Sequence, residues 1–148
     1  MTLKKTTLIP KGELPPVGDL PIGSRIPFSP NPNFEGRVGE LKKLAETLSP
    51  LLQGEGPGVR SGIVINQAIT GMGGLGKTQL AVEFAYRYGR YYRGVHWLDL
   101  ADPSLLDSEI AQCGAQMSLA NFPADQPSQV VLTLNTWKAD GPRLLVLD

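Results

Sequence analysis

One segment of the chain combines residue types that could bind phosphate. Residues 70–85 read TGMGGLGKTQLAVEFA, a run of glycines followed directly by a lysine, a threonine and an apolar stretch. The spacing Gly71-x-x-x-x-Gly76-Lys77-Thr78 is that of a phosphate-binding loop between a strand and a helix. Glycine lets the backbone approach an anion closely, and the N–H groups at the start of the following helix point at the same anion.

The side chains next to the glycines supply the rest of the chemistry. Lys77 offers a mobile positive charge for the β- and γ-phosphates, and Thr78 offers a hydroxyl that can ligate Mg²⁺. The apolar run 144–147 ends in Asp148, an acid that would hold Mg²⁺ through water. We therefore predict Lys77 and Asp148 as catalytic residues, and Thr78 and Asp148 as metal ligands. The predicted phosphate-binding residues are Gly71, Met72, Gly73, Gly74, Leu75, Gly76, Lys77, Thr78 and Gln79.

Alternating helices and strands must position this loop. Apolar residues at helical spacing predict helices over about 38–52, from the glycines to Gly89, over about 103–117 and over about 127–138. Short apolar runs predict strands at about 62–70, 94–100 and 143–148. This order predicts a three-layer α/β domain of P-loop NTPase type around a mostly parallel sheet that ends after the strand at 144–148.

The expected inward faces follow from the same periodicities. In the strand at 94–100, Val95 and Trp97 should face one side, and His96 and Leu98 the other. The inward faces expected for the last two helices are Leu105, Leu106, Ile110 and Cys113 in the first, and Val130, Val131, Leu134 and Trp137 in the second.

The bulk composition excludes several classes of protein. The chain has 148 residues, enough for one domain with a core, and its 14 basic and 14 acidic residues balance. A general nucleic-acid or membrane-surface binder would need a basic excess. The single cysteine excludes an internal disulfide, and the N-terminus lacks the apolar stretch of a signal peptide. We expect a cytoplasmic protein.

Residues 1–33 are rich in proline and glycine and are expected to be a linker with short extended pieces, such as 24–28. Because the chain stops at the acid that ends a strand, we expect it to be a fragment of a longer protein.

Several conspicuous residues have ordinary explanations. We expect His96 and Cys113 to be packed in the core, and Asp99 and Asp102 to form a turn and a helix cap. The run 86–94, YRYGRYYRG, could suggest binding of single-stranded nucleic acid, but a solvated helix end with basic residues near the negative end of its dipole is simpler. Arg37 could either reach a nucleotide or form a salt bridge on its own helix.

Several segments of the chain resemble those of a known protein family. GMGGLGKTQLAVEFA is similar to the phosphate-binding loop of the NB-ARC group of STAND signal-transduction ATPases. Residues 34–44, FEGRVGELKKL, resemble the segment before that loop, and VHWL and LLVLD resemble the second strand and the Walker B strand. The resemblance covers about residues 34–148, and it implies that Phe34 and Arg37 lie at the nucleotide.

The resemblance implies a molecular switch that binds ATP or ADP with Mg²⁺. ADP would hold the off state, exchange to ATP would permit homo-oligomerisation, and any hydrolysis would be slow. Sensor and effector domains would lie in the full-length chain. The family also places a later strand between the strand before the glycine loop and the Walker B strand, so residues 1–148 would lack a central strand.

Two other functions fit the same residues. One is an AAA-like ATPase that hydrolyses ATP continuously, and the other is a scaffold that has lost ATPase activity and only mediates interactions. The intact pair of Lys77 and Thr78 favours a working nucleotide site over the scaffold.

Overall fold

The computed structural model describes residues 12–52, 63–65, 75–139 and 141–148. It contains the helices α1 (Val38–Leu52), α2 (Leu75–Tyr88), α3 (Leu106–Gln116) and α4 (Gln126–Ala139). Its strands are β1 (Ile63–Ile65), β2 (Val95–Leu98) and β3 (Arg143–Leu147). Two 3₁₀ turns, η1 (Gly89–Tyr91) and η2 (Pro103–Leu105), precede β2 and α3 respectively.

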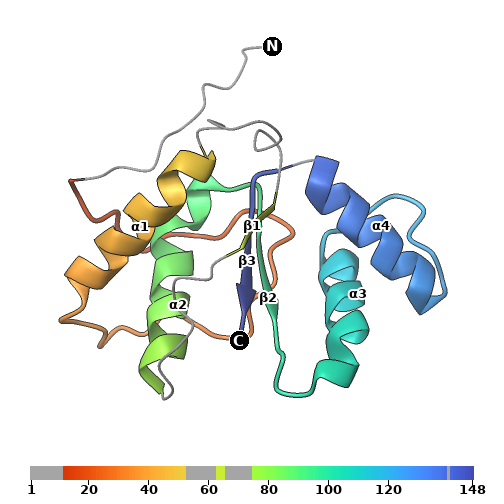
Figure 1. Cartoon of the computed structure of the whole chain (residues 1–148), viewed down its shortest axis with the longest axis horizontal. Coiled ribbons are helices and arrows are strands. Elements are labelled where there is room, and N and C mark those ends of the chain that lie inside the picture. The colour runs from red at the N-terminus through yellow and green to blue at the C-terminus, as the bar shows by residue number, and fades with distance from the viewer. Residues whose placement is uncertain (1–11, 53–62, 66–74, 140) are drawn as a thin grey trace, which may run out of the picture.

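The three strands form a parallel sheet in the order β1-β3-β2. Ile65 pairs with Leu145, and Leu98 pairs with Leu147. Helices α1 and α2 lie on one side of the sheet, and α3 and α4 lie on the other (Figure 1). The described part of the chain is thus a three-layer α/β arrangement, and its identity as a P-loop NTPase fold stays a prediction.

The two faces of the sheet support separate hydrophobic clusters. Val95, Trp97, Leu144 and Val146 pack with α1 and α2, whereas Leu98 and Leu145 pack with α3 and α4. Successive strand residues therefore alternate between the two clusters, as side chains on a pleated strand must. The alternation predicted for the strand at 94–100 is confirmed.

Strand β3 lies between β1 and β2 in the described sheet. The resemblance implied a later strand, one that residues 1–148 lack, between the strand that precedes the glycine loop and the strand that ends at Asp148. Within the described residues β1 and β3 are hydrogen-bonded neighbours, and the strand order that the resemblance implies stays a prediction. The backbone groups of a strand need partners, and within the described residues β3 provides them for β1.

The predicted faces of the last two helices also need correction. Leu105, Leu106 and Val131 have exposed fractions of 51, 37 and 57%. Leu105 lies in the 3₁₀ turn η2 and Leu106 begins α3, so both precede the turns of α3 that pack on the sheet. In α4 the inward stripe includes Thr133 and Trp137, both fully buried, which leaves Val131 facing solvent.

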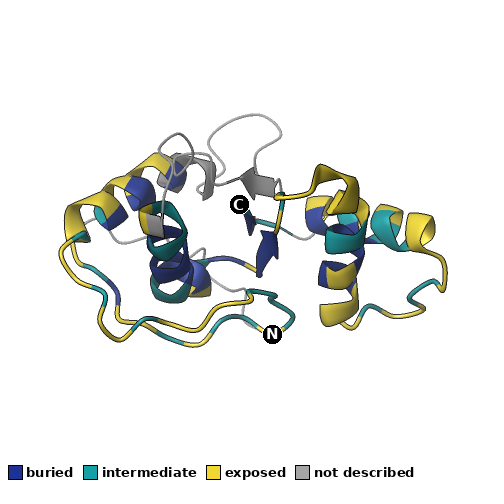
Figure 2. Ribbon diagram, turned by 90° about the horizontal axis from the view of Figure 1, so that it is seen from below, coloured by how far each residue is buried: buried dark blue, intermediate teal, exposed yellow. Residues whose placement is uncertain are grey.

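Residues 12–37 form an extended segment that we call the N-terminal strap. Figure 2 shows it as a trace of mostly exposed and partly buried residues beside α1 and α2, and Pro15 within it is buried. Leu14, Leu20, Ile26 and Phe34 pack against the cluster on this side of the sheet. Within the described residues, the segment expected to be a linker is therefore packed on the domain.

Candidate functional site

The fold brings together the two predicted metal ligands from distant parts of the sequence. Thr78 lies in the first turn of α2, and Asp148 directly follows β3. The hydroxyl of Thr78 donates a hydrogen bond to Oδ1 of Asp148, with 3.3 Å between the oxygens. Both side chains are accessible, so a hydroxyl and a carboxylate face solvent at one end of the sheet.

The backbone of Asp148 is held in place by the strand beside it. Its N–H donates to the carbonyl of Leu98 at 3.0 Å, and its carbonyl accepts from the N–H of Leu100 at 2.7 Å. These bonds continue the ladder between β2 and β3 beyond both strand ends. The carboxylate of Asp148 therefore projects from a restrained backbone.

The predicted phosphate loop is described only in part. Gly71, Met72, Gly73 and Gly74 lie outside the described residues. The backbone of Leu75 begins α2, and Gly76 and Lys77 follow in its first turn. The N-terminal N–H groups of α2 therefore lie at the end of the sheet where Thr78 meets Asp148.

Arg37 forms the salt bridge that we considered and a second bond as well. Its Nε and Nη2 donate to the two carboxylate oxygens of Glu40 at 2.5 and 2.9 Å. This carboxylate raises the pKa of Arg37, and the guanidinium in turn lowers the pKa of Glu40. Nη1 of Arg37 donates to the carbonyl of Gly76 at 2.7 Å. Arg37 thus connects the start of α1 to the last glycine of the predicted loop.

The other two residues that we predicted at the nucleotide have protein partners. Phe34 is partly buried against the cluster around α1 and α2. Oε1 of Gln79 accepts from Nδ2 of Asn31 in the strap at 3.2 Å. Their place at a nucleotide stays a prediction.

A cavity of about 330 Å³ lies beside Glu40, the partner of Arg37. It is lined by residues of α1 and by Leu80 of α2. Its lining combines a carboxylate, an ammonium and a hydroxyl with two leucines: Glu40, Lys43, Leu44, Thr47 and Leu80. Its volume is at the lower end of the range of small-molecule sites, and its lining is more polar than that of most such sites.

The histidine and the cysteine are packed in the core, as predicted. His96 is fully buried, its Nε2 lies 3.1 Å from Nη1 of Arg143, and its ring centroid lies 5.0 Å from that of Trp137. Burial, assisted by the charge of Arg143, lowers the pKa of His96 to about 3. Burial likewise raises the pKa of the Cys113 thiol to about 11. Both groups are therefore neutral at pH 7.

The acids after β2 form the turn and the cap that we expected. Oδ1 of Asp99 accepts from the N–H of Ala101 at 2.9 Å. Asp102 caps η2 by accepting from the N–H of Ser104 at 3.1 Å. Among the residues that the structure describes, no group of three or more His, Cys, Asp or Glu side chains is gathered as a metal site. Mg²⁺ commonly uses one or two protein oxygens with water and phosphate, so Thr78 and Asp148 fit that requirement.

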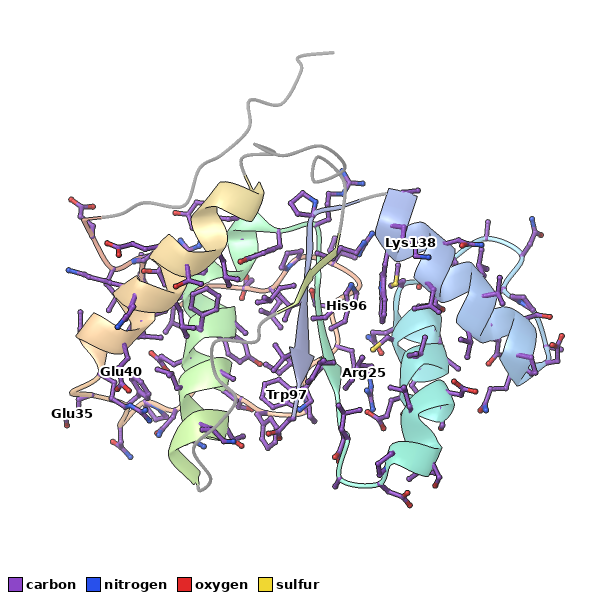
Figure 3. All side chains as sticks on the ribbon, viewed as in Figure 1. Arg25, Glu35, Glu40, His96, Trp97 and Lys138 are labelled. Carbon is purple, nitrogen blue, oxygen red and sulfur yellow. The ribbon has the colours of Figure 1, made fainter. Side chains whose placement is uncertain are left out.

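Sequence reasoning missed the residues that bind the strap. Nη1 of Arg25 donates to Oε1 of Glu109 at 3.0 Å, and Figure 3 shows Arg25 between β2 and α3. Arg87, which we expected at a solvated helix end, forms an ion pair with Glu83 and donates to the carbonyl of Pro15. Arg90 donates to the carbonyl of Pro16. No periodicity marks such contacts, because they join single residues across more than 70 positions.

Two further observations bear on the class of the protein. In the described part of the chain, no helix has the length and apolar character that crossing a membrane requires. Comparison of the sequence with protein-family models, curated proteins and solved structures finds no match. The assignment of a function therefore depends on the residues and their geometry.

Proposed function

We propose that the chain is the nucleotide-binding part of a P-loop NTPase of NB-ARC type, which acts as a cytoplasmic switch between ADP and ATP. The observation that supports this most directly is the contact of Thr78 with Asp148. The two side chains were predicted as Mg²⁺ ligands from separate motifs, 70 residues apart in sequence. Their meeting at the start of α2 is what a nucleotide site requires.

Each part of the nucleotide has a candidate partner. The N-terminus of α2 and the side chain of Lys77 offer positive potential to phosphate. Thr78 and Asp148 offer oxygens to Mg²⁺, which neutralises phosphate charge when it is bound. We propose that the cavity beside α1 receives the base, because Arg37 bonds both to Glu40 in its lining and to Gly76 of the predicted loop.

A nucleotide-dependent switch must interact differently with ADP and with ATP. ATP and ADP differ by the γ-phosphate, and only contacts to that group can bias the two states. Lys77 and the Mg²⁺ ligands are the described residues best suited to make such contacts. We propose that the ADP state is the off state, that the ATP state oligomerises and acts on effector domains, and that ATPase activity is at most slow.

The first experiment tests nucleotide binding directly. The 148-residue chain is purified without added nucleotide, denatured, and the released compounds are identified by chromatography. Titration calorimetry with Mg-ADP then compares the original chain with Lys77→Ala and with Lys138→Ala, a control at an exposed lysine of α4 on the far side of the sheet (Figure 3). Loss of a charged hydrogen bond of about 3 kcal/mol predicts about a hundredfold weaker binding for Lys77→Ala.

A second pair of variants tests the metal ligands. Thr78→Val and Asp148→Asn should reduce the gain in affinity that Mg²⁺ gives, while binding without Mg²⁺ changes little. Unchanged Mg-ADP binding by Lys77→Ala would refute the proposal. A chain that is purified empty and then hydrolyses ATP rapidly would indicate the continuously working ATPase, and a chain that binds no nucleotide would indicate the scaffold.

A further inference from the structure

The N-terminal strap contacts the β2 edge of the described sheet. Strand β2 is at the edge of the described sheet, and Arg25 forms a parallel bridge beside His96. The N–H of Arg25 donates to the carbonyl of Val95 at 2.8 Å, and its carbonyl accepts from the N–H of Trp97 at 2.9 Å. At this point the strap adds one residue of strand to β2.

The side chain of Arg25 fixes this edge contact to α3. Its Nη1 donates to the carbonyl of Trp97 and to Glu109, both at 3.0 Å, and its Nη2 donates to Gln112 at 3.1 Å. The side chains of Arg25 and Glu109 are only 23 and 14% exposed. Partial burial makes such an ion pair stronger than a pair at the open surface.

Glu109 also holds the loop that restrains Asp148. Its Oε1 accepts from the N–H of Asp99 at 2.9 Å, as well as from Arg25. The residues on both sides of Asp99, Leu98 and Leu100, form the two backbone bonds to Asp148. A short series of contacts therefore connects the strap to the backbone of a predicted Mg²⁺ ligand.

The strap also contacts the other half of the candidate site. Nδ2 of Asn31 donates to Gln79, the residue after Thr78, and Nη1 of Arg37 donates to the carbonyl of Gly76. The start of α2 and the end of β3 are the two elements that carry Thr78 and Asp148. One segment of chain therefore restrains both.

We propose that the N-terminal strap regulates the nucleotide site, so that docking of the strap and binding of Mg-nucleotide strengthen each other. This inference rests on the proposed function. A ligand held by both Thr78 and Asp148 favours the arrangement that the strap maintains, and linkage makes the effect reciprocal. A protein or domain that pulled the strap away would therefore release nucleotide.

The strap is suited to detach without unfolding the domain. Apart from the group of bonds at Arg25, it is attached by dispersed hydrogen bonds and by apolar side chains of which Leu14, Leu20, Ile26 and Phe34 are only partly buried. Ile22, at the turn before Arg25, is fully exposed. Segments with few buried contacts open at a small fraction of the cost of global unfolding.

Hydrogen exchange of the whole chain tests the coupling without any mutation. With saturating Mg-ADP, we expect amide exchange at Gly18 and Arg25, both bonded within the strap contacts, to slow about fivefold or more. Amides of α4 serve as the internal control and should change little. Bound nucleotide with unchanged exchange in the strap would overturn this inference and leave the proposed function standing.

A matched pair of variants measures the reciprocal effect, that of the strap contacts on the affinity for Mg-ADP. Glu109→Ala removes the partner shared by Arg25 and Asp99, whereas Asp107→Ala removes an exposed acid from the same turn of α3. We expect about fivefold weaker Mg-ADP binding for Glu109→Ala and little change for Asp107→Ala. Equal affinities of all three chains would refute the coupling. A wild-type chain that does not bind Mg-ADP would refute the proposed function, and the coupling with it.

Discussion

The tight contact between α3 and α4 at Gly114 gives a sharp prediction of stability. At Gly114, helix α3 lies so near α4 that an added Cβ would be 2.0 Å from Oγ1 of Thr133 and 3.0 Å from Cε1 of Phe122. Thr133 is fully buried, and its hydroxyl donates to the carbonyl of Gln129 at 2.7 Å. Gly114→Ala should therefore force the helices apart or break this hydrogen bond.

Effects of opposite sign determine how much Gly114→Ala changes the free energy of unfolding. Alanine is favoured over glycine inside a helix by about 1 kcal/mol. Overpacking a tight contact costs about 1–3 kcal/mol, and a lost buried hydrogen bond adds about 1 kcal/mol. Because a contact at 2.0 Å cannot be tolerated, we expect Gly114→Ala to lower the free energy of unfolding by about 2 kcal/mol.

Urea unfolding followed by circular dichroism measures this difference. Gly39→Ala in α1 is the matched control, because a Cβ at Gly39 meets no atom within 4 Å. It should leave stability unchanged or raise it slightly. Adding Thr133→Ala to Gly114→Ala removes the clashing oxygen, so the double variant should lose less than the sum of the single changes. If Gly114→Ala proves as stable as Gly39→Ala, the described packing of α3 on α4 is wrong.

Three further predictions concern buried polar groups. His96 stays neutral in the fold, with its pKa lowered to about 3, whereas it titrates near 6.5 when unfolded. Protonation therefore favours the unfolded chain, and between pH 7 and pH 5 the wild type should lose about 2 kcal/mol more stability than His96→Gln in urea titrations. The Cys113 thiol, with its pKa raised to about 11, should not react with Ellman's reagent at pH 8 until the chain is unfolded by denaturant. Arg87→Met leaves the carboxylate of Glu83, which is 2% exposed, without its cation, so it should cost about 3 kcal/mol in thermal or urea unfolding, and adding Glu83→Leu should restore part of that loss.

The elements with a strong periodicity could be predicted from the sequence. The helix expected over about 38–52 matches α1, and its apolar stripe of Leu41, Leu44, Ala45 and Leu48 is buried. Prediction from periodicity failed where a polar side chain takes a place on the buried face of a helix. In α4, Thr133 lies on the buried face because Gly114 of α3 leaves room for it, and Val131 faces solvent.

The packing of the strap on the domain could not be predicted, because amino-acid composition does not show which distant residues a segment contacts. Its prolines exclude a helix, and this favoured a free linker. Yet proline keeps its carbonyl group, and the carbonyls of Pro15 and Pro16 accept from Arg87 and Arg90. Contacts of this kind depend on where two distant segments meet, which neither segment encodes by itself.

The candidate site follows from topology more than from any local feature. Helix α2 comes after β1, and β1 pairs with β3 in parallel, so the start of α2 and the end of β3 lie at the same end of the sheet. This arrangement alone brings Thr78 near Asp148, which is why residue types in two separate motifs were enough to predict the pair. It leaves open how firmly the pair is held. The bonds from Arg37 to Gly76, from Asn31 to Gln79 and from Glu109 to Asp99 provide that restraint. Two of these residues, Asn31 and Glu109, lie in no motif that the sequence showed. The chemistry of the site can therefore be separated from its regulation: substitutions at Thr78 and Asp148 should weaken nucleotide binding only when Mg²⁺ is present, whereas substitutions at Asn31 and Glu109 should weaken Mg-nucleotide binding although both proposed Mg²⁺ ligands remain.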